Sequence, residues 1–343
     1  MRICICGGGN LGHVVAGYLA SFKEHEIVIL TNRPEDWDLA IKVTDLYGAV
    51  FYGPLALVTS SPSKALSGVD VVILCLPGFA YHDVLLKIRD YVSPHVKVGA
   101  IVSSSGFFFE AFSLLPEDIM IFGFQRVPFI ARIKEYGKSA ELKGYKKELN
   151  VAIERCSEDE KHAFCKILSA LFRTPVHLLH SFYEAALTNS NPLLHPARLY
   201  SLWKDWEPGI VYAKNPLFYE EWTDEASELL IAMDNEFQHL LSFLPVGKGS
   251  IPPILEYYDS HDSRSLTNKL RSIIAFSGIL SPMKDSTEGH GYVPDFSSRY
   301  FIEDIPYGMR YIVEVANQEG VEIPTIEIIY HWGLSCIDNY CQR

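Results

Sequence analysis

Residues 2–12 read Arg-Ile-Cys-Ile-Cys-Gly-Gly-Gly-Asn-Leu-Gly, and a helical pattern over residues 14–20 follows them. The apolar start predicts a buried strand, and the glycines that follow fit the pattern G-x-G-x-x-G. Gly7 permits a tight turn, Gly9 leaves room for a pyrophosphate, and Gly12 lets the helix pack close to the sheet. The free N–H groups of the helix's first turn then face the phosphates. The stretch therefore predicts a dinucleotide-binding turn in preference to a glycine-rich turn without a ligand.

The predicted second strand, residues 25–30, leads to the residues that distinguish NAD from NADP. An NAD enzyme usually carries an acidic residue about 20 positions after the last glycine of the motif, where this chain has Asn32. Arg33 follows, and a guanidinium can hold a 2′-phosphate through charge-assisted hydrogen bonds. We therefore expect NADP, with NAD as the alternative. In the competing interpretation Arg33 points into solvent beside Glu35 and Asp36.

Strand and helix patterns alternate through the first half of the chain, as in a doubly wound, mainly parallel α/β sheet. Further strands are predicted over residues 69–76, 96–103, 119–124, 149–153 and 175–179. A helix is predicted to begin at a capping box of Ser157 and Glu160. Residues 1–180 are therefore expected to form a Rossmann domain. The residues predicted to bind its cofactor are Gly7, Gly9, Asn10, Leu11, Gly12, Thr31, Asn32, Arg33, Leu76 and Pro77.

Beyond residue 180 the sequence predicts an all-α domain over residues 181–343. Apolar residues recur there at three- and four-residue spacing, which indicates helices. The predicted helical segments cover residues 182–200, 223–243, 265–276 and 307–319. Prolines at positions 192, 196, 208, 216, 245, 252 and 253 are expected to break these segments apart. A helical domain after a nucleotide-binding domain leaves a cleft between the two, and this cleft is the expected place for a second substrate.

The composition predicts a cytoplasmic two-domain enzyme with small-molecule partners. The 343 residues suffice for two cores, no apolar run is long enough to span a membrane, and the seven cysteines lack C-x-x-C spacing. We therefore expect reduced thiols and no metal. The net charge of −12 comes from the second half, because residues 1–180 carry equal numbers of acidic and basic side chains. An acidic surface excludes nucleic acid and anionic lipid as partners, and a homodimer is left open.

Two segments of the second half carry polar residues that packing alone does not explain. In residues 188–198, His195 follows a Leu-Leu pair and precedes a proline. It is a candidate proton donor, although a hydrogen-bonded structural histidine is the competing interpretation. In residues 294–308, Arg299 can clamp a carboxylate, and an Asp can hold the histidine in one tautomer. For Arg299 the competing interpretation is a surface ion pair with Glu303, one helical turn later.

At these residues the sequence resembles the octopine/nopaline (opine) dehydrogenase family. The resemblance rests on the glycine-rich start, on residues 125–132, on residues 191–196 and on residues 291–308. Family members reductively condense a 2-oxo acid, often pyruvate, with the amino group of an amino acid, and they use NADH or NADPH. The match is weaker between residues 200 and 290, where we expect the specificity for the amino donor to lie.

The resemblance also implies roles for individual residues. It pairs His195 with Asp304 for proton transfer and assigns Arg299 to the carboxylate of the oxo acid. It thereby selects Asp304 over the adjacent Glu303, which spacing alone does not distinguish. Gln125 and Asn191 are the further residues implied to bind substrate, and Ala131 stands where some relatives carry a cysteine.

Three other functions are compatible with a dinucleotide-binding turn. A 2-oxo acid reductase of the ketopantoate type, or a glycerol-3-phosphate dehydrogenase, needs a lysine proton donor, and no lysine of the second half stands in a matching apolar helical context. A non-catalytic nucleotide sensor has no need for His195, Arg299 and Asp304 together. A structural role explains neither polar segment.

Overall fold

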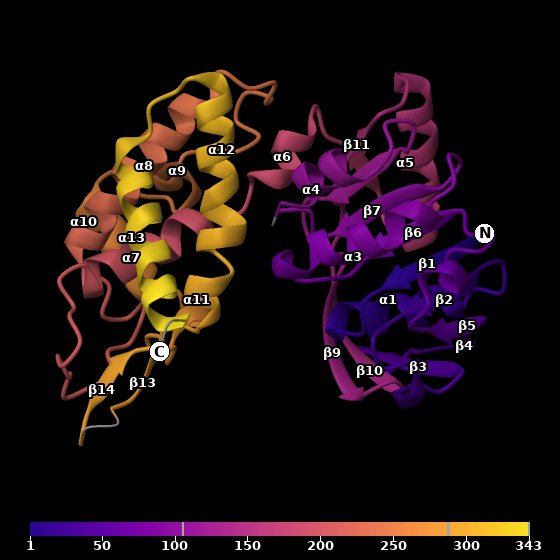
Figure 1. The fold of residues 1–343 in the computed structure, drawn as a ribbon, viewed down its shortest axis with the longest axis horizontal. Helices are drawn as coiled ribbons and strands as arrows, with labels where there is room; N and C mark the ends of the chain where they lie inside the picture. The colour runs from indigo at the N-terminus through magenta and orange to yellow at the C-terminus, as the bar shows by residue number, and fades with distance from the viewer. Residues whose placement is uncertain (105, 287–288, 342–343) are drawn as a thin grey trace. The chain divides into compact units, whose positions relative to one another are not determined.

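The computed structural model describes residues 1–104, 106–286 and 289–341. The chain forms two units, Met1–Thr188 and Asn189–Arg343 (Figure 1). The boundary falls later than residue 180, where the sequence analysis places it. Helix α6 (Phe182–Ala186) accounts for the difference, because it packs against strands β8 and β11 of the first unit.

An eight-stranded sheet forms the centre of the first unit, in the order β12-β11-β8-β7-β6-β1-β2-β5. All neighbouring strands run parallel except β8 and β11, which pair antiparallel. The strand order reverses between β1 and β6, and this reversal is where such sheets bind ligands. The predicted Rossmann fold is confirmed. The strands are β1 (Arg2–Cys6), β2 (Glu26–Leu30), β5 (Leu57–Thr59), β6 (Val71–Leu74), β7 (Lys97–Ile101), β8 (Ile121–Phe124), β11 (Leu149–Glu154) and β12 (Val176–Leu178).

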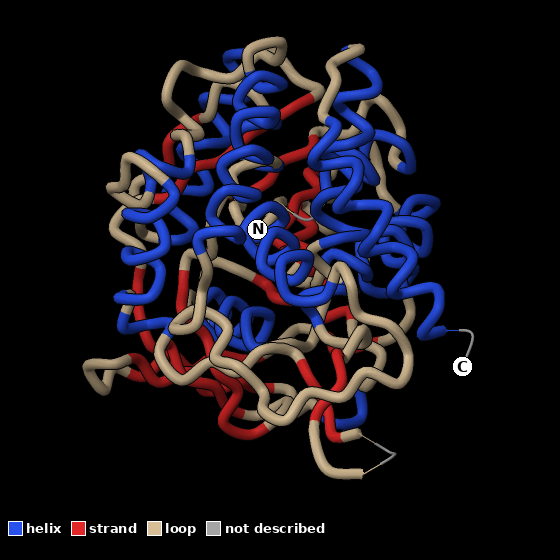
Figure 2. The backbone as a smooth tube through the Cα atoms, turned by 90° about the vertical axis from the view of Figure 1, so that its left-hand side faces the viewer, coloured by secondary structure: helices blue, strands red, loops and turns tan. Residues whose placement is uncertain are grey.

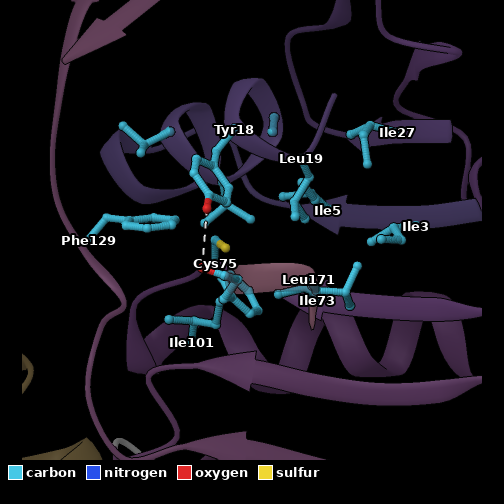
Figure 3. Packing of buried hydrophobic residues seen from close by; sticks show 14 of the residues in the cluster. Ile3, Ile5, Tyr18, Leu19, Ile27, Ile73, Cys75, Ile101, Phe129 and Leu171 are labelled. Carbon is cyan, nitrogen blue, oxygen red and sulfur yellow. Dashed lines mark hydrogen bonds between the residues drawn. The ribbon is translucent and has the colours of Figure 1, made fainter. Parts of the chain in front are cut away.

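The first helix, α1 (Asn10–Ala20), packs between this sheet and a second one. Figure 3 shows Tyr18 and Leu19 of α1 beside Cys75 and Ile5, in the core of the unit. The buried Tyr18 hydroxyl donates to the Phe172 carbonyl at 3.2 Å, which satisfies the one polar group that this ring brings into the core. The β1 side chains are buried on both faces, as expected for a central parallel strand.

The second sheet has the order β4-β3-β10-β9 and is absent from the sequence-based expectation. Its strands alternate buried and exposed residues, and charged side chains occupy many of the exposed positions, so that they lack the continuous apolar runs of the main sheet. The sheet covers the outer side of α1. Its strands are β3 (Ala40–Asp45), β4 (Val50–Pro54), β9 (Phe129–Glu135) and β10 (Ser139–Tyr145).

The capping box predicted for the last long helix of the first unit is present. The Ser157 side chain accepts the Glu160 N–H, and the Glu160 carboxylate accepts the Ser157 N–H. The remaining helices of this unit are α2 (Pro62–Ala65), α3 (Tyr81–Ile88), α4 (Phe107–Leu114), α5 (Glu158–Phe172) and the short η1 (Pro34–Asp36), η2 (Gly78–Ala80) and η3 (Arg89–Tyr91).

The second unit is mainly helical, with α7, α10 and α13 packed against α8. Figure 2 shows its helices in blue and a small pair of strands, β13 and β14, in red. None of the described helices combines the length and the apolar character needed to cross a bilayer. The elements are α7 (Asn191–Trp203), α8 (Asp224–Leu241), α9 (Ile254–Tyr257), α10 (Ser263–Ser272), η4 (Ile274–Phe276), β13 (Met283–Asp285), β14 (Tyr292–Pro294), α11 (Arg299–Ile302), η5 (Ile305–Met309), α12 (Arg310–Glu319) and α13 (Pro324–Cys341).

The structure changes three of the helices predicted for this half. The segment 182–200 is two helices, α6 and α7, because Pro192, one of the expected breaks, lies in the first turn of α7, where it lacks the N–H that a continuous helix would need. Pro196 does not break the helix as expected but lies inside α7. The helix expected over residues 265–276 is α10 followed by the short η4. The helix expected over residues 307–319 begins with the π-helical turn η5, in which Pro306 again lies at the start. Such turns often mark functional sites, and this one directly follows Asp304.

Candidate active site

The glycine turn between β1 and α1 is shaped by close backbone contacts. Gly7 has φ +117°, which L side chains rarely adopt, and a Cβ on Gly12 would overlap the Gly7 carbonyl oxygen. Gly9 has ordinary extended backbone, and a Cβ there would meet no atom of the described residues beyond its chain neighbours within 4 Å. In the part of the chain that the structure describes, no side chain caps the first turn of α1. The turn therefore offers open space and free N–H groups at the start of α1, which fits a dinucleotide pyrophosphate.

The other residues predicted at this turn lie around it. Leu76 adjoins Gly7, and Pro77 follows it at the exposed end of β6. The Asn10 side chain accepts the Ile133 N–H at 2.7 Å and so ties the start of α1 to β9, while Leu11 is half-buried.

A histidine that the sequence analysis overlooked holds the turn in place. His13 is fully buried, with Nδ1 2.9 Å from the Gly9 carbonyl oxygen and Nε2 2.7 Å from the Gly137 N–H. Because a carbonyl only accepts and a peptide N–H only donates, Nδ1 carries the proton. Burial lowers the pKa of His13 and favours this neutral form. The clue in the sequence is a polar residue between the apolar positions of the helix.

The residues predicted to select the cofactor follow β2. Thr31 is buried, whereas Asn32 and Arg33 are exposed. The Arg33 guanidinium lies over the Tyr136 ring, 3.9 Å from its centre, and 3.5 Å from an Asp36 carboxylate oxygen. The structure thus contains the contact with Asp36 that the competing interpretation requires, together with a stacking contact that orients the guanidinium.

The contact predicted between His195 and Asp304 is present in the second unit. Nδ1 of His195, on α7, lies 2.7 Å from Oδ2 of Asp304, which caps η5. The structure adds a third member, because Nε2 of His195 lies 2.8 Å from the Tyr219 hydroxyl. A carboxylate only accepts, so the neutral imidazole carries its proton on Nδ1 and accepts the Tyr219 hydroxyl at Nε2.

Aromatic rings surround this triad of Asp304, His195 and Tyr219. Tyr300 meets the imidazole edge to face at 4.5 Å between ring centres, and Phe218 lies 5.8 Å from it. His195 is only 9% exposed and Tyr219 only 4%. Burial raises the pKa of Tyr219, and Tyr300, Tyr258 and Asp304 add to the effect, so its phenol is neutral. The imidazole of His195 can therefore carry its proton on Nδ1, toward Asp304, while Nε2 accepts the buried Tyr219 hydroxyl.

Two arginines, the buried Arg198 and the exposed Arg271, fix the turn that carries Tyr219. Arg198, one helical turn after His195 on α7, donates to the Phe218 carbonyl at 3.1 Å and to the Glu221 carbonyl at 2.6 Å. Arg271 donates to the Trp222 carbonyl at 2.8 Å. Burial lowers the pKa of Arg198 to about 10, which leaves it charged at neutral pH. Tyr219 itself belongs to the stretch where the family resemblance is weak.

Arg299 does not join the triad. Its side chain is 83% exposed, and it donates to Oε2 of Glu303 through Nε at 3.1 Å and Nη2 at 2.8 Å. This is the ion pair of the competing interpretation, and it raises the pKa of Arg299. An exposed pair of this kind contributes little stability, so Arg299 can exchange Glu303 for another carboxylate.

Gln125 and Asn191, the further residues expected to bind substrate, have different surroundings. The Gln125 amide nitrogen donates to the Glu184 carbonyl at 3.1 Å, and its amide oxygen accepts from the Asn150 amide at 3.0 Å. Both polar atoms of this side chain are therefore hydrogen-bonded to residues of the first unit. Asn191 begins α7 one turn before His195 and is half-buried. Ala131 is buried in β9.

Known proteins resemble this chain over nearly its whole length. The family model "NAD/NADP octopine/nopaline dehydrogenase, alpha-helical domain" matches residues 178–336, and "NADP oxidoreductase coenzyme F420-dependent" matches residues 2–102. The opine dehydrogenase of Haliotis discus hannai is 28% identical over 97% of this chain and 89% of its own. The uncharacterized protein y4xO of Sinorhizobium fredii is 30% identical over 97% and 94%.

Solved structures give the same result over both units. An octopine dehydrogenase with NADH and L-arginine superimposes with a TM-score of 0.83 at 28% identity, covering 98% of this chain and 90% of that one. The same enzyme with NADH and pyruvate gives 0.82 at 27% identity, with coverage of 98% and 89%. The chain therefore belongs to the octopine/nopaline dehydrogenase family, and it is an NAD(P)-linked oxidoreductase that acts on CH–NH bonds.

Proposed function

We propose that this protein condenses a 2-oxo acid with the amino group of an amino acid and reduces the resulting imine. The observation that carries the proposal is the hydrogen bond of 2.7 Å between His195 and Asp304, two residues that are far apart in the sequence. Support comes from octopine dehydrogenase structures that contain L-arginine or pyruvate. In this proposal the first unit holds the cofactor, and the second holds the substrates.

The first unit fits a nicotinamide dinucleotide. The open space at Gly9 accepts the pyrophosphate, and the N–H groups at the start of α1 bind it. The exposed Arg33, oriented by Tyr136, binds the 2′-phosphate of NADP. When bound, the cofactor supplies the hydride that reduces the imine carbon.

The second unit supplies the proton that the departing oxygen needs. The ammonium group of the amino acid gives up one proton to solvent before its nitrogen attacks the oxo acid, and the carbinolamine oxygen must gain one proton to leave as water. His195 delivers this proton, and Asp304 stabilises the imidazolium and holds its orientation. His195 takes up the next proton from solvent between turnovers.

The most direct test measures NAD(P)H oxidation with a matrix of 2-oxo acids and amino acids, with each component omitted in turn. We expect oxidation that needs both acids. Oxidation with the oxo acid alone would identify a simple reductase instead, and binding of the dinucleotide without turnover would identify a sensor.

Arg33→Ala is expected to weaken NADPH binding by about tenfold or more while NADH binding changes little, because only NADPH carries the phosphate that Arg33 would hold. Fluorescence titration with both cofactors measures the two dissociation constants. Arg89→Ala is a matched control, since Arg89 is also an exposed arginine 3.5 Å from a neighbouring aspartate. Equal weakening of both cofactors by Arg33→Ala would contradict the assignment.

Arg299→Lys is expected to raise the KM for the oxo acid about tenfold and to change the KM for the amino acid less. Lysine keeps the charge but loses the planar fork that grips a carboxylate at two points. Glu303→Gln provides the contrast, because it frees Arg299 and should leave the KM for the oxo acid unchanged or lower it. If both variants raise this KM alike, the ion pair is structural and Arg299 does not bind the oxo acid.

A further inference from the structure

Tyr219 engages the imidazole nitrogen of His195 that faces away from Asp304. Nδ1 is committed to the Asp304 carboxylate at 2.7 Å, and Nε2 lies 2.8 Å from the Tyr219 hydroxyl. A proton that leaves His195 while the Asp304 contact is kept must leave from Nε2. The first oxygen that such a proton meets is the Tyr219 hydroxyl.

The structure also shows why Tyr219 does not readily move aside. Its ring stacks on Phe276 at 4.1 Å between centres with an angle of 19°, and the Trp222 ring lies parallel to it at 6.1 Å. The backbone of its turn is held by Arg198 and Arg271. Moving the phenol away from Nε2 would disturb these stacked rings and buried hydrogen bonds together.

We propose that Tyr219 relays the proton from His195 to the substrate, a role that rests on the condensation proposed above. In one step the Tyr219 hydroxyl gives its proton to the departing oxygen of the carbinolamine and takes the Nε2 proton of the imidazolium. The C–O bond breaks with its electron pair on the oxygen, which leaves as water. The nitrogen lone pair forms the C=N bond, and His195 and Tyr219 both end neutral.

The surroundings favour a concerted transfer. The titratable groups around the imidazole are Asp304 on Nδ1, Tyr219 on Nε2 and Tyr300 against the ring, and Tyr258 lies near Tyr219. Burial raises the pKa of both Tyr219 and Tyr300, so a free tyrosinate is disfavoured. A phenol in this environment transfers a proton well only when it regains one at the same time.

Tyr219→Phe tests the relay, because it removes the hydroxyl and keeps the stacked ring. We expect kcat to fall about a hundredfold, the lower end of what a positioned acid contributes, with little change in either KM. The rate is also measured in mixtures of H₂O and D₂O and plotted against the deuterium fraction. The plot should be curved for the wild type, where two protons move in one step, and linear for the variant. Tyr200→Phe, on the same helix as His195 with its ring against Trp332, should keep both the rate and the curve.

Two further measurements keep the test decisive. If Tyr219→Phe fails to fold, 3-fluorotyrosine is placed at position 219, because it keeps the shape of tyrosine and makes the phenol more acidic. A changed solvent isotope effect on the rate supports the relay. An unchanged solvent isotope effect overturns it. ¹⁵N NMR of His195, which needs no turnover, should show Nδ1 protonated in the neutral wild type and a shifted Nε2 signal in Tyr219→Phe. An unshifted Nε2 signal overturns the hydrogen bond on which the relay depends.

The outcomes separate the relay from the proposed function. A wild-type protein that condenses no pair of acids overturns the function, whatever the NMR result. An active wild type in which Tyr219→Phe keeps kcat within about twofold and keeps the curved dependence overturns the relay alone.

Discussion

His195→Ala is expected to lower kcat by about a hundredfold or more, because it removes the acid from which the proton for the departing oxygen comes. One limb of the kcat–pH profile should flatten. Asp304→Asn should produce a smaller loss, since the imidazole remains but its cation loses the carboxylate 2.7 Å away. Steady-state kinetics across pH with saturating substrates measures all three effects.

The control for this series is His261→Ala, which removes a histidine of the same unit whose side chain is 84% exposed. It should keep both the rate and the pH profile. Circular dichroism and thermal unfolding show whether each variant is folded. If the His195 and Asp304 variants lose activity only in proportion to lost folded protein, these residues are structural and the hydrogen bond is part of the packing.

The predictable parts of this molecule are those that short stretches of sequence determine. The turn at Gly7 and the capping box at Ser157 each depend on a few neighbouring residues, and both are found where the sequence places them. The His195–Asp304 contact joins distant segments and could be predicted only through the family resemblance. Most of the main sheet was predictable because its buried parallel strands form continuous apolar runs. The edge strand β5 was not predicted, because it has only three residues and all three are half-buried.

The features of the structure that the sequence did not predict depend on contacts between residues far apart in the chain. Strands β3 and β10 pair with each other across a long stretch of chain, and their alternating pattern with many charges conceals them. Tyr219 is a site residue because it contacts His195, and this contact depends on Arg198 and Arg271, which hold its turn beside α7. No local pattern in the sequence predicts these contacts. For Arg299 the sequence allows both a surface ion pair and a carboxylate clamp, and the structure contains the ion pair.

Gly9→Ala and Gly12→Ala are expected to separate cofactor binding from folding. At Gly9 a methyl group meets no protein atom within 4 Å and the backbone is extended. Alanine there restricts the unfolded chain, which stabilises by about 0.4–1 kcal/mol, but it caps the helix less well than glycine. The two effects oppose each other, so thermal stability should barely change. The methyl group would nevertheless fill the space proposed for the pyrophosphate.

Overpacking of about 1–3 kcal/mol at that position corresponds to a dissociation constant for the dinucleotide that is about fivefold to 150-fold higher. Gly12→Ala should act on the fold instead, since its methyl group overlaps the Gly7 carbonyl oxygen and must push α1 away from β1. We expect a lower melting temperature for Gly12→Ala without any cofactor present. Thermal unfolding with and without NADPH measures both effects. The fold itself leaves room for a side chain at Gly9, so a loss of NADPH binding in Gly9→Ala would come from the cofactor's need for that space. If Gly9→Ala binds NADPH as tightly as the wild type does, the pyrophosphate does not pass Gly9.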